Sequence, residues 1–306
     1  MKTSELSEIE ILCHGATAYD ITMSVKHHPA ADIKEFALDK VECGGGPAAN
    51  AAVTIARMGH KTALSGYLGN DLYGQLNLEE LAKDHVNTDL IQRGDASTPL
   101  SVVMAKPNGE RSLVNYPSQS PFMTRLSPQY KSCSPQVILL DGHETNTAFK
   151  LLEFAKKQNI TTVLDAGSYS AGKKALASEV DHLVVTERFA HEYTSQKKTE
   201  AALETLFEIS NSVVITVGKE GLLWKNKNNS GKMPAFSVQS IDTTGAGDAF
   251  HGAFCVGLIR GYDWETILRY ASAVAALTCT KHGGRLGIPR EHEVQNFLKK
   301  KWSTDW

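Results

Sequence analysis

Short apolar runs alternate with longer segments of helical periodicity along most of the chain. The apolar runs predict strands at residues 9–15, 61–69, 136–142, 160–167, 181–186 and 212–218. Segments such as AANAAVTIARMG, TNTAFKLLEFAKKQN and AALETLFEIS lie between them and show the helical pattern. Strands that alternate with helices in this way are typical of a parallel sheet with helices on both faces. We therefore expect an α/β fold with a central, mostly parallel sheet.

A different pattern occupies two segments, about 18–43 and 98–118. The second contains TPLSVVMAKPNGERSLVNYP, which predicts two strands joined by the turn residues PNGE, with no helix between them. We expect the two segments to form a small β-sheet lid. An exposed strand edge is a surface at which subunits can pair, so a homodimer through the lid is a further expectation. No repeat or long linker divides the chain, and residues 1–306 are expected to form one domain.

Length and charge narrow the class of protein. With 306 residues, the chain is long enough for one large α/β domain. Lysine and arginine number 32 against 34 for aspartate and glutamate, so the net charge of -2 provides no field suited to a nucleic-acid backbone. Nucleic acid is therefore not expected as a primary partner.

The cysteines and the apolar runs indicate the compartment. The five cysteines are widely spaced and form no CxxC pair, which argues against a disulfide framework or a zinc site. The N-terminus has no basic-then-apolar signal pattern, and no apolar run approaches the roughly 20 residues that cross a bilayer. We expect a cytoplasmic protein without a membrane partner.

The stretch DTTGAGDAF lies between a predicted strand at 235–241 and a predicted helix that ends at Gly261. Gly245 and Gly247 can adopt backbone angles that other residues avoid, and the N–H groups of the helix's first turn point outward together. Such a turn forms an anion pocket, strengthened by the positive end of the helix dipole. Asp248 is placed to accept the proton of an alcohol that attacks a bound phosphate. The alternative is an ordinary turn in which the aspartate caps the helix.

A second glycine cluster, GGGPAAN, also leads into a predicted helix. Asn50 presents an amide one turn inside that helix, and its two donors and one acceptor suit a polyol hydroxyl. Asn50 could instead satisfy backbone groups of its own helix. Gly44, Gly46 and Ala49 also match the GxGxxA dinucleotide fingerprint. Against that match, the preceding LDKVEC is a poor strand pattern, and no acidic strand end follows where a ribose partner is expected.

Further polar residues lie at predicted strand ends or on the lid. Asp20 follows a predicted strand, and Asp141 and Asp165 each end one, where α/β sheets place ligands. Each of the three could instead be an ordinary turn residue. Asn115 lies on the lid, and we include it with Asp141 among the candidate sugar-binding residues. Arg111 is also on the lid, where an arginine is usually solvated.

The two glycine segments, DTTGAGDAFHGAF and GGGPAANAAVTIARMG, resemble the paired signatures of the PfkB, or ribokinase-like, carbohydrate kinases. The resemblance covers essentially the whole chain. It implies a ribokinase-like fold and transfer of the γ-phosphoryl group of ATP to a sugar hydroxyl. Residue by residue, it implies Asp248 as the catalytic base, Gly245, Ala246 and Gly247 as the anion hole, Asp20, Gly45, Gly46 and Asn50 as sugar ligands, and Thr216, Gly218, Gly221, Thr243, His282 and Gly283 as nucleotide ligands.

Two positions depart from the family pattern. Where many members have an NxxE motif that helps to organise magnesium, this chain has TERF, with Thr186 and Phe189 at the asparagine and glutamate positions. Magnesium must then be held largely through water and nucleotide, or by Glu187. Pro47 replaces the lysine of the GGKG version of the sugar motif. The GGGPAAN segment with its Pro47, together with the LLDGHE and TVLDAG segments, more closely resembles the ketohexokinase and sulfofructose kinase branch, in which a ketose is phosphorylated.

The expected function is an ATP-dependent carbohydrate kinase that acts on a ketose such as fructose or sulfofructose. A nucleoside kinase or ribokinase of the same fold stays open, as do an NAD-dependent oxidoreductase and a non-catalytic sugar-binding sensor. ATP and Mg²⁺ are the expected cofactors. Potassium activation, which is common in the resembled family, is not decided by these residues.

Overall fold

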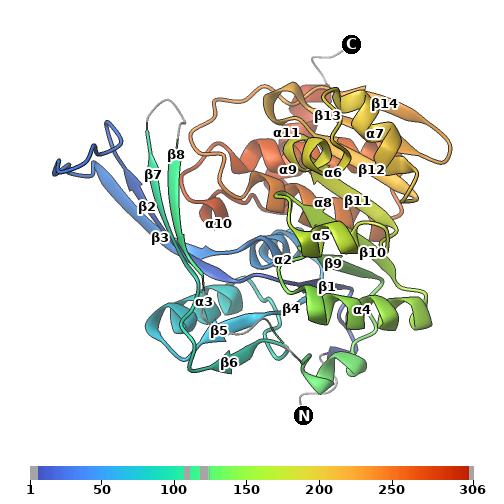
Figure 1. Ribbon diagram of the computed structural model, residues 1–306, viewed down its shortest axis with the longest axis horizontal. Helices are drawn as coiled ribbons and strands as arrows, with labels where there is room; N and C mark the ends of the chain where they lie inside the picture. The colour runs from blue at the N-terminus through green and yellow to red at the C-terminus, as the bar shows by residue number, and fades with distance from the viewer. Residues whose placement is uncertain (1–5, 107–110, 118–122, 124, 303–306) are drawn as a thin grey trace.

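The computed structural model describes residues 6–106, 111–117, 123 and 125–302, and its centre is an eight-stranded sheet (Figure 1). Six of its strands are mutually parallel, and two antiparallel strands extend one edge. In spatial order they are β14 (Ser230–Met233), β13 (Leu222–Asn226), β12 (Ser212–Thr216), β11 (His182–Thr186), β10 (Thr161–Ala166), β9 (Val137–Leu140), β1 (Ile11–His14) and β4 (Thr62–Ser65). The predicted mostly parallel sheet is confirmed.

Helices cover both faces of this sheet because its parallel strands are apolar on both sides. Val163 and Val184 belong to one buried cluster, whereas their neighbours Leu164 and Val185 belong to the other. The first cluster packs under α2 (Pro47–Arg57), α8 (Ala246–Ile259), α9 (Trp264–Thr278) and α11 (Glu291–Trp302). The second packs under α4 (Thr145–Gln158), α5 (Ala171–Leu176), α6 (Glu187–Thr194) and α7 (Thr199–Phe207).

A four-stranded sheet projects from the main body and forms the predicted lid (Figure 1). Its order is β3 (Asp39–Gly45), β2 (Ala18–Ser24), β7 (Leu100–Ala105) and β8 (Arg111–Tyr116). Strands β7 and β8 are antiparallel, as the predicted hairpin requires, whereas β2 and β7 are parallel. The PNGE turn, 107–110, lies outside the described residues.

Smaller elements join the lid to the body. A two-stranded sheet of β5 (Tyr67–Gly69) and β6 (Gln92–Gly94) lies beside α3 (Leu72–Lys83). The short helix α10 (Gly284–Gly287) contacts lid strand β3 as well as α2 and α9, so it bridges lid and body. Two 3₁₀ turns, η1 (Pro128–Ser132) and η2 (Gly218–Glu220), complete the described elements.

Three local predictions were wrong. Residues 235–241 form no strand and pair with no strand of the sheet; the Ile241 N–H donates instead to Cys279 O, at 2.8 Å. The polar LDKVEC segment, judged a poor strand, contributes to β3, because pairing with β2 supplies its hydrogen bonds. The single strand predicted at 61–69 is divided at Gly66 into β4 and β5, which belong to different sheets.

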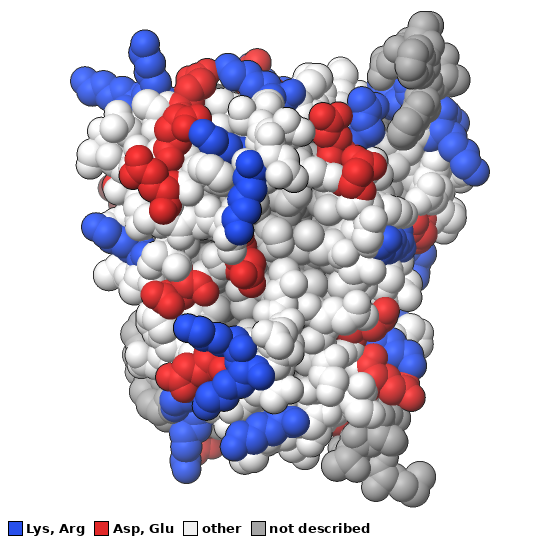
Figure 2. Space-filling model, turned by 90° about the vertical axis from the view of Figure 1, so that its right-hand side faces the viewer, with Lys and Arg blue, Asp and Glu red and all other residues white. Residues whose placement is uncertain are grey.

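The surface and composition add two observations. Basic and acidic side chains are interspersed on the face shown in Figure 2, as the small net charge suggests. All five cysteines are free thiols. Within the described ranges, each helix is too short or too polar to span a bilayer.

Candidate active site

The predicted site residues converge on one edge of the large sheet, where its parallel strands all end. Asp141 follows β9, Asp165 lies near the end of β10, and Glu187 follows β11. Polar residues at the carboxyl ends of adjacent parallel strands line a common crevice. The lid sheet and the start of α8 lie at the same edge, since α2 follows lid strand β3 and its Asn50 bonds to Asp248 of α8.

The DTTGAGD loop forms the start of α8. Gly245 precedes the helix with φ of 75°, a left-handed conformation that favours glycine, and α8 begins at Ala246. The N–H groups of the first turn have no acceptor inside the helix. A Cβ on Gly247 would meet no protein atom within 4 Å, so the space beside this turn is open. The loop therefore has the donors and the room for a phosphate group.

Asp242 joins this loop to the segment around Gly283, which contains two of the predicted nucleotide ligands. Its carboxylate accepts hydrogen bonds from the backbone N–H of Thr244 and of Gly283, both at 2.9 Å. The structure thus brings Thr243 and Gly283, two predicted nucleotide residues, into neighbouring loops. His282 beside them is exposed to solvent.

Asp248 lies in the first turn of α8 without being its cap, which is Gly245. Asn50 of α2 donates from Nδ2 to Asp248 Oδ2 at 2.8 Å. Burial, followed by the neighbouring Asp165 carboxylate, raises the pKa of Asp248 to about 6, against opposing effects of Asn50 and His251. A carboxylate with this pKa is ionised at neutral pH yet basic enough to accept a proton from an alcohol in a transition state.

Asp165 and His251 are charged or polar neighbours of Asp248. His251 Nδ1 lies 3.3 Å from Asp165 Oδ2 and 2.6 Å from the Gly247 carbonyl oxygen. His251 Nε2 lies 3.1 Å from the carbonyl oxygen of Val184 in the sheet. His251 was not among the sequence candidates, because two of its partners, Asp165 and Val184, lie on separate strands and cannot be inferred from its own helix.

Two predicted sugar ligands share one face of the lid. Asp20 is directly opposite Cys43 on one side and Ser101 on the other, and Ser101 is opposite Asn115. Side chains of directly opposite residues point to the same face. Asp20 is buried there, whereas Asn115 is exposed. The expectation that Asp20 ends a strand of the main sheet was wrong: it lies inside lid strand β2.

The GGGPAAN segment brings the lid to α2. Gly46 precedes α2 with φ of 94°, and a Cβ there would approach Ala16 O to 2.5 Å. A Cβ on Gly45 would lie 2.2 Å from Asp20 Oδ2, so glycine leaves room for that carboxylate. The GxGxxA match is therefore not part of a dinucleotide-binding βαβ unit, since β3 belongs to the antiparallel lid pair β2–β3.

Asp141 has a full set of backbone partners. Its Oδ2 accepts the N–H of Ala16 at 2.7 Å and of Ala48 at 3.2 Å, and its Oδ1 accepts the N–H of His143 at 2.9 Å. Burial would raise the pKa of this carboxyl, but the charge and hydrogen bonds of His143 and the charge of Lys173 hold it below its usual range. The arrangement supports a role in holding three loops together, and the predicted sugar contact of Asp141 stays a prediction.

The remaining predicted nucleotide residues lie at the end of β12. A Cβ on Gly218, at φ of 59°, would meet nothing within 4 Å, so this glycine borders open space. Gly221 has a structural reason to be glycine, since a Cβ there would approach Met233 O to 2.0 Å. Thr216 donates from Oγ1 to Val185 O at 3.4 Å. The three residues are close together, but only Gly218 faces free space through its backbone.

The TERF segment forms the start of α6. Thr186, at the asparagine position of the NxxE motif, caps the helix by accepting the N–H of Phe189 at 3.2 Å. Glu187 is the first helical residue, and its Oε1 accepts a hydrogen bond from Thr199 Oγ1 at 2.6 Å. Mg²⁺ typically keeps several waters and needs one or two carboxylates beside substrate phosphates. The free oxygen of Glu187, at the same sheet edge, fits that limited role, and no cluster of three or more ligating side chains occurs among the described residues.

Two arginines of the site were missed or misjudged from the sequence. Arg111, expected to be solvated, donates from the lid to Thr244 Oγ1 at 2.6 Å and so reaches the phosphate loop. Arg285 of α10 is only 1% exposed, and a Cβ on Gly44 would lie 1.7 Å from its Nη1. The unusual GGRLG sequence, with an arginine amid glycines, was the one available signal for this residue.

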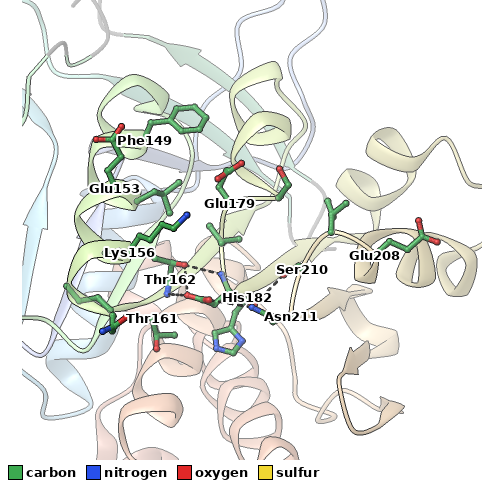
Figure 3. A pocket seen from close by; sticks show the side chains of 18 residues that line it. Phe149, Glu153, Lys156, Thr161, Thr162, Glu179, His182, Glu208, Ser210 and Asn211 are labelled. Atoms are coloured by element: carbon green, nitrogen blue, oxygen red, sulfur yellow. Dashed lines mark hydrogen bonds between the residues drawn. The ribbon is translucent and has the colours of Figure 1, made fainter.

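A separate hollow of about 1220 Å³ lies at the opposite, amino-terminal edge of the sheet (Figure 3). It is lined by side chains such as Thr161, His182 and Asn211 and contains none of the predicted site residues. The candidate active site is therefore defined by the converging residues and the lid.

Comparison with known proteins agrees with the fold and identifies the family. A family model described as "pfkB family carbohydrate kinase" matches residues 8–291. The ribokinase of Lactococcus lactis subsp. lactis is 26% identical over 94% of this chain and 96% of its own. An Arabidopsis thaliana protein named "Probable fructokinase-5" is 27% identical over 84% of this chain and 88% of its own. The structure of Arabidopsis thaliana ribokinase complexed with ribose and ATP superposes with a TM-score of 0.84 at 22% identity, covering 95% of this chain and 99% of that one.

Proposed function

We propose, on the basis that this chain belongs to the pfkB family of carbohydrate kinases, that it transfers the γ-phosphoryl group of ATP to a ketose. As a member it is a phosphotransferase that acts on a sugar hydroxyl. The observation that carries the proposal is the position of Asp248, in the first turn of α8 beside the open phosphate loop and hydrogen-bonded to Asn50. The choice of a ketose as the acceptor rests on Pro47 and on the LLDGHE and TVLDAG segments.

The chain's own groups suffice for the proton and charge steps. The oxygen of the sugar hydroxyl forms a bond to the γ-phosphorus while the bond between that phosphorus and ADP breaks, and Asp248 accepts the proton of the hydroxyl. The N–H groups at Gly245, Ala246 and Gly247 stabilise the negative charge on the transferring group. Asp20 and Asn115, on one face of the lid, orient the sugar. Mg²⁺ neutralises phosphate charge when bound, and Glu187 is the carboxylate that we assign to it, through water.

The acceptor is tested by measuring ADP release and sugar phosphate formation with fructose, sulfofructose, ribose, deoxyribose, other aldoses and nucleosides. We expect the highest kcat/KM with a ketose. Ribose is the second candidate, because the similar Lactococcus lactis protein is a ribokinase. A preference for ribose would overturn the ketose assignment but keep the kinase. Sugar binding without turnover on any acceptor would instead indicate the sensor.

Lid closure is proposed to depend on Arg111. Arg111 joins lid strand β8 to the DTTGAGD loop through Thr244. In the Arg111→Ala variant this contact is lost, so the closed lid should be less stable and water should enter the site. We expect kcat/KM for sugar to fall about tenfold and the ratio of ATP hydrolysis to sugar phosphorylation to rise. Both rates are measured in one assay.

The matched control for this prediction is Ser112→Ala. Ser112 is the next residue of β8, and its hydroxyl contacts His28 Nδ1 within the lid, at 3.1 Å. If the two variants change the hydrolysis ratio equally, the effect belongs to the lid in general and Arg111 has no specific role.

We also propose a homodimer through the lid. Large apolar side chains are exposed there, including Phe36 at 81% and Val114 at 62%. Contiguous exposed apolar surface and open strand edges are features of subunit interfaces. Val114→Asp should convert a dimer to a monomer in sedimentation equilibrium, whereas Phe149→Asp, on α4 away from the lid, should not. A monomeric wild type at micromolar concentration would contradict the proposal.

The proposal places the kinase in the cytoplasm as one domain, with the lid as part of it. The five free thiols agree with a reducing compartment.

A further inference from the structure

Arg285 of α10 is a buried cation that contacts three other segments of the chain. Its Nη1 donates to Asn77 Oδ1 at 2.7 Å and lies 3.3 Å from Glu80 Oε2, both on α3. Its Nη2 donates to the Gly45 carbonyl oxygen at 3.3 Å, and its Nε to Asn50 Oδ1 at 3.4 Å. Gly44 makes the space for the guanidinium. The arginine therefore connects α10, α3, lid strand β3 and α2.

The Asn50 amide stands between this arginine and the proposed base. Its oxygen faces Arg285 Nε, a donor, and its nitrogen faces Asp248 Oδ2, an acceptor. An amide turned by 180° would place its NH₂ against the guanidinium and its oxygen against the carboxylate, and both contacts would be repulsive. The two charged neighbours thus select one orientation of the amide.

We propose that Arg285 is a positioning residue for phosphoryl transfer, because its guanidinium fixes the Asn50 amide in the orientation that donates to the Asp248 carboxylate. This inference rests on the proposed function for the role of Asp248. In the proposed reaction Arg285 contacts neither the phosphate nor the sugar, and it acts on Asp248 through Asn50. Since the same guanidinium holds Gly45 O, the position of the base is also tied to the lid strand that packs against Asp20.

The charges around both groups determine which substitution is informative. Asp248 faces Asp165 from β10, His251 from its own helix and Asp20 from the lid, in addition to Asn50. Arg285 faces Glu80, Cys43 and Asp20. Removal of the positive charge would therefore act on Asp20 as well. Arg285→Lys keeps the charge but loses the planar set of donors, so it tests the orientation of Asn50.

The experiment is a carboxyl ¹³C NMR titration of Asp248 in the substrate-free full-length protein, with Asp248→Asn used to assign its signal. A hydrogen bond to the charged form lowers a carboxyl pKa, so its loss raises the pKa. We expect Arg285→Lys to raise the pKa of Asp248 by about one unit. The acid limb of kcat/KM should move upward by the same amount, and kcat should fall more than sugar affinity.

The matched control is Arg57→Lys. Arg57 donates to the carbonyl oxygens of Arg285 and Ile288, at 2.9 and 2.8 Å, and so anchors the same segment without touching Asn50. It should leave the titration of Asp248 unchanged. In an Asn50→Ala background, Arg285→Lys should add no further shift, because the intermediate group is already absent.

Three results would overturn the inference: an unchanged Asp248 pKa in Arg285→Lys, an equal shift in Arg57→Lys, or an additive shift in the Asn50→Ala background. If Arg285→Lys does not fold, Asn77→Ala removes the 2.7 Å partner of the guanidinium without changing charge, and should give a smaller shift in the same direction. No shift there would equally overturn it. Because the titration needs no turnover, a failed kinase assay with the expected NMR shifts would contradict the proposed function alone.

Discussion

Replacement of Asp248 by asparagine should lower kcat by about 10³-fold while nucleotide affinity stays nearly unchanged. General base catalysis by a positioned carboxylate contributes roughly 10²–10⁴-fold, and the amide cannot accept the proton. The N–H donors of the phosphate loop are backbone groups, so they remain after the substitution. Steady-state kinetics and calorimetric titration with nucleotide measure the two quantities.

The same variant should be more stable than the wild type at neutral pH. The folded-state pKa of Asp248, about 6, lies above the ordinary value of 3.8, so the stability contributed by this group is present below pH 3.8 and lost as pH rises through 6. At pH 7 the wild type therefore carries an unfavourable buried charge that asparagine lacks. We expect Tm to rise by roughly 2–4 °C at pH 7 and the difference to shrink toward pH 4.

Asp263→Asn is the control for the Asp248 variant. Asp263 caps the neighbouring helix α9 by accepting the N–H of Thr266 at 3.0 Å, and asparagine is an equally good cap. Its turnover should match the wild type. Unchanged turnover in Asp248→Asn would remove Asp248 from the role of base, and loss of nucleotide binding would show that the phosphate loop had rearranged.

Replacement of Asp141 by alanine should destabilise the protein strongly. The substitution leaves the N–H groups of Ala16, Ala48 and His143 without their buried acceptor. Hydrogen bonds to a charged acceptor contribute about 1.5–3 kcal/mol each, so we expect a loss of at least about 3 kcal/mol. An unfolding entropy of about 2.1 cal/mol/K per residue gives roughly 1.6 °C per kcal/mol for 306 residues, so Tm should fall by at least about 5 °C. Denaturant and thermal unfolding measure this change.

Asp141→Asn separates the structural role from a sugar contact. The amide oxygen can still accept from Ala16 and Ala48, so the stability loss should be smaller and the sugar KM should change little. Asp181→Ala is a control at the opposite edge, where the carboxylate accepts the Thr162 N–H at 2.9 Å. A large rise in sugar KM for Asp141→Asn with normal stability would instead support the sugar-binding role predicted from the sequence.

The sequence was sufficient wherever the signal is local. Alternating apolar runs predicted the parallel sheet, since both faces of each strand must be buried. The glycines before α8 predicted a glycine turn at a helix start, because a positive φ at Gly245 and the first turn of a helix are properties of adjacent residues. Prediction from the sequence failed where the secondary structure of a segment depends on the strand with which it pairs. Residues 235–241 carry a strand pattern without a strand to pair with, and the polar β3 is a strand because β2 pairs with it.

By itself, then, the sequence determined the fold class, the glycine loops and the residue types available for phosphoryl transfer. Only the tertiary structure decided which polar groups meet. Asn50 and Asp248 are 198 positions apart, and Asn50 and Arg285 are 235 apart. Hydrophobic periodicity and glycine conformation depend on neighbours along the chain, whereas a buried hydrogen bond depends on complementary donors and acceptors that the fold brings within about 3 Å.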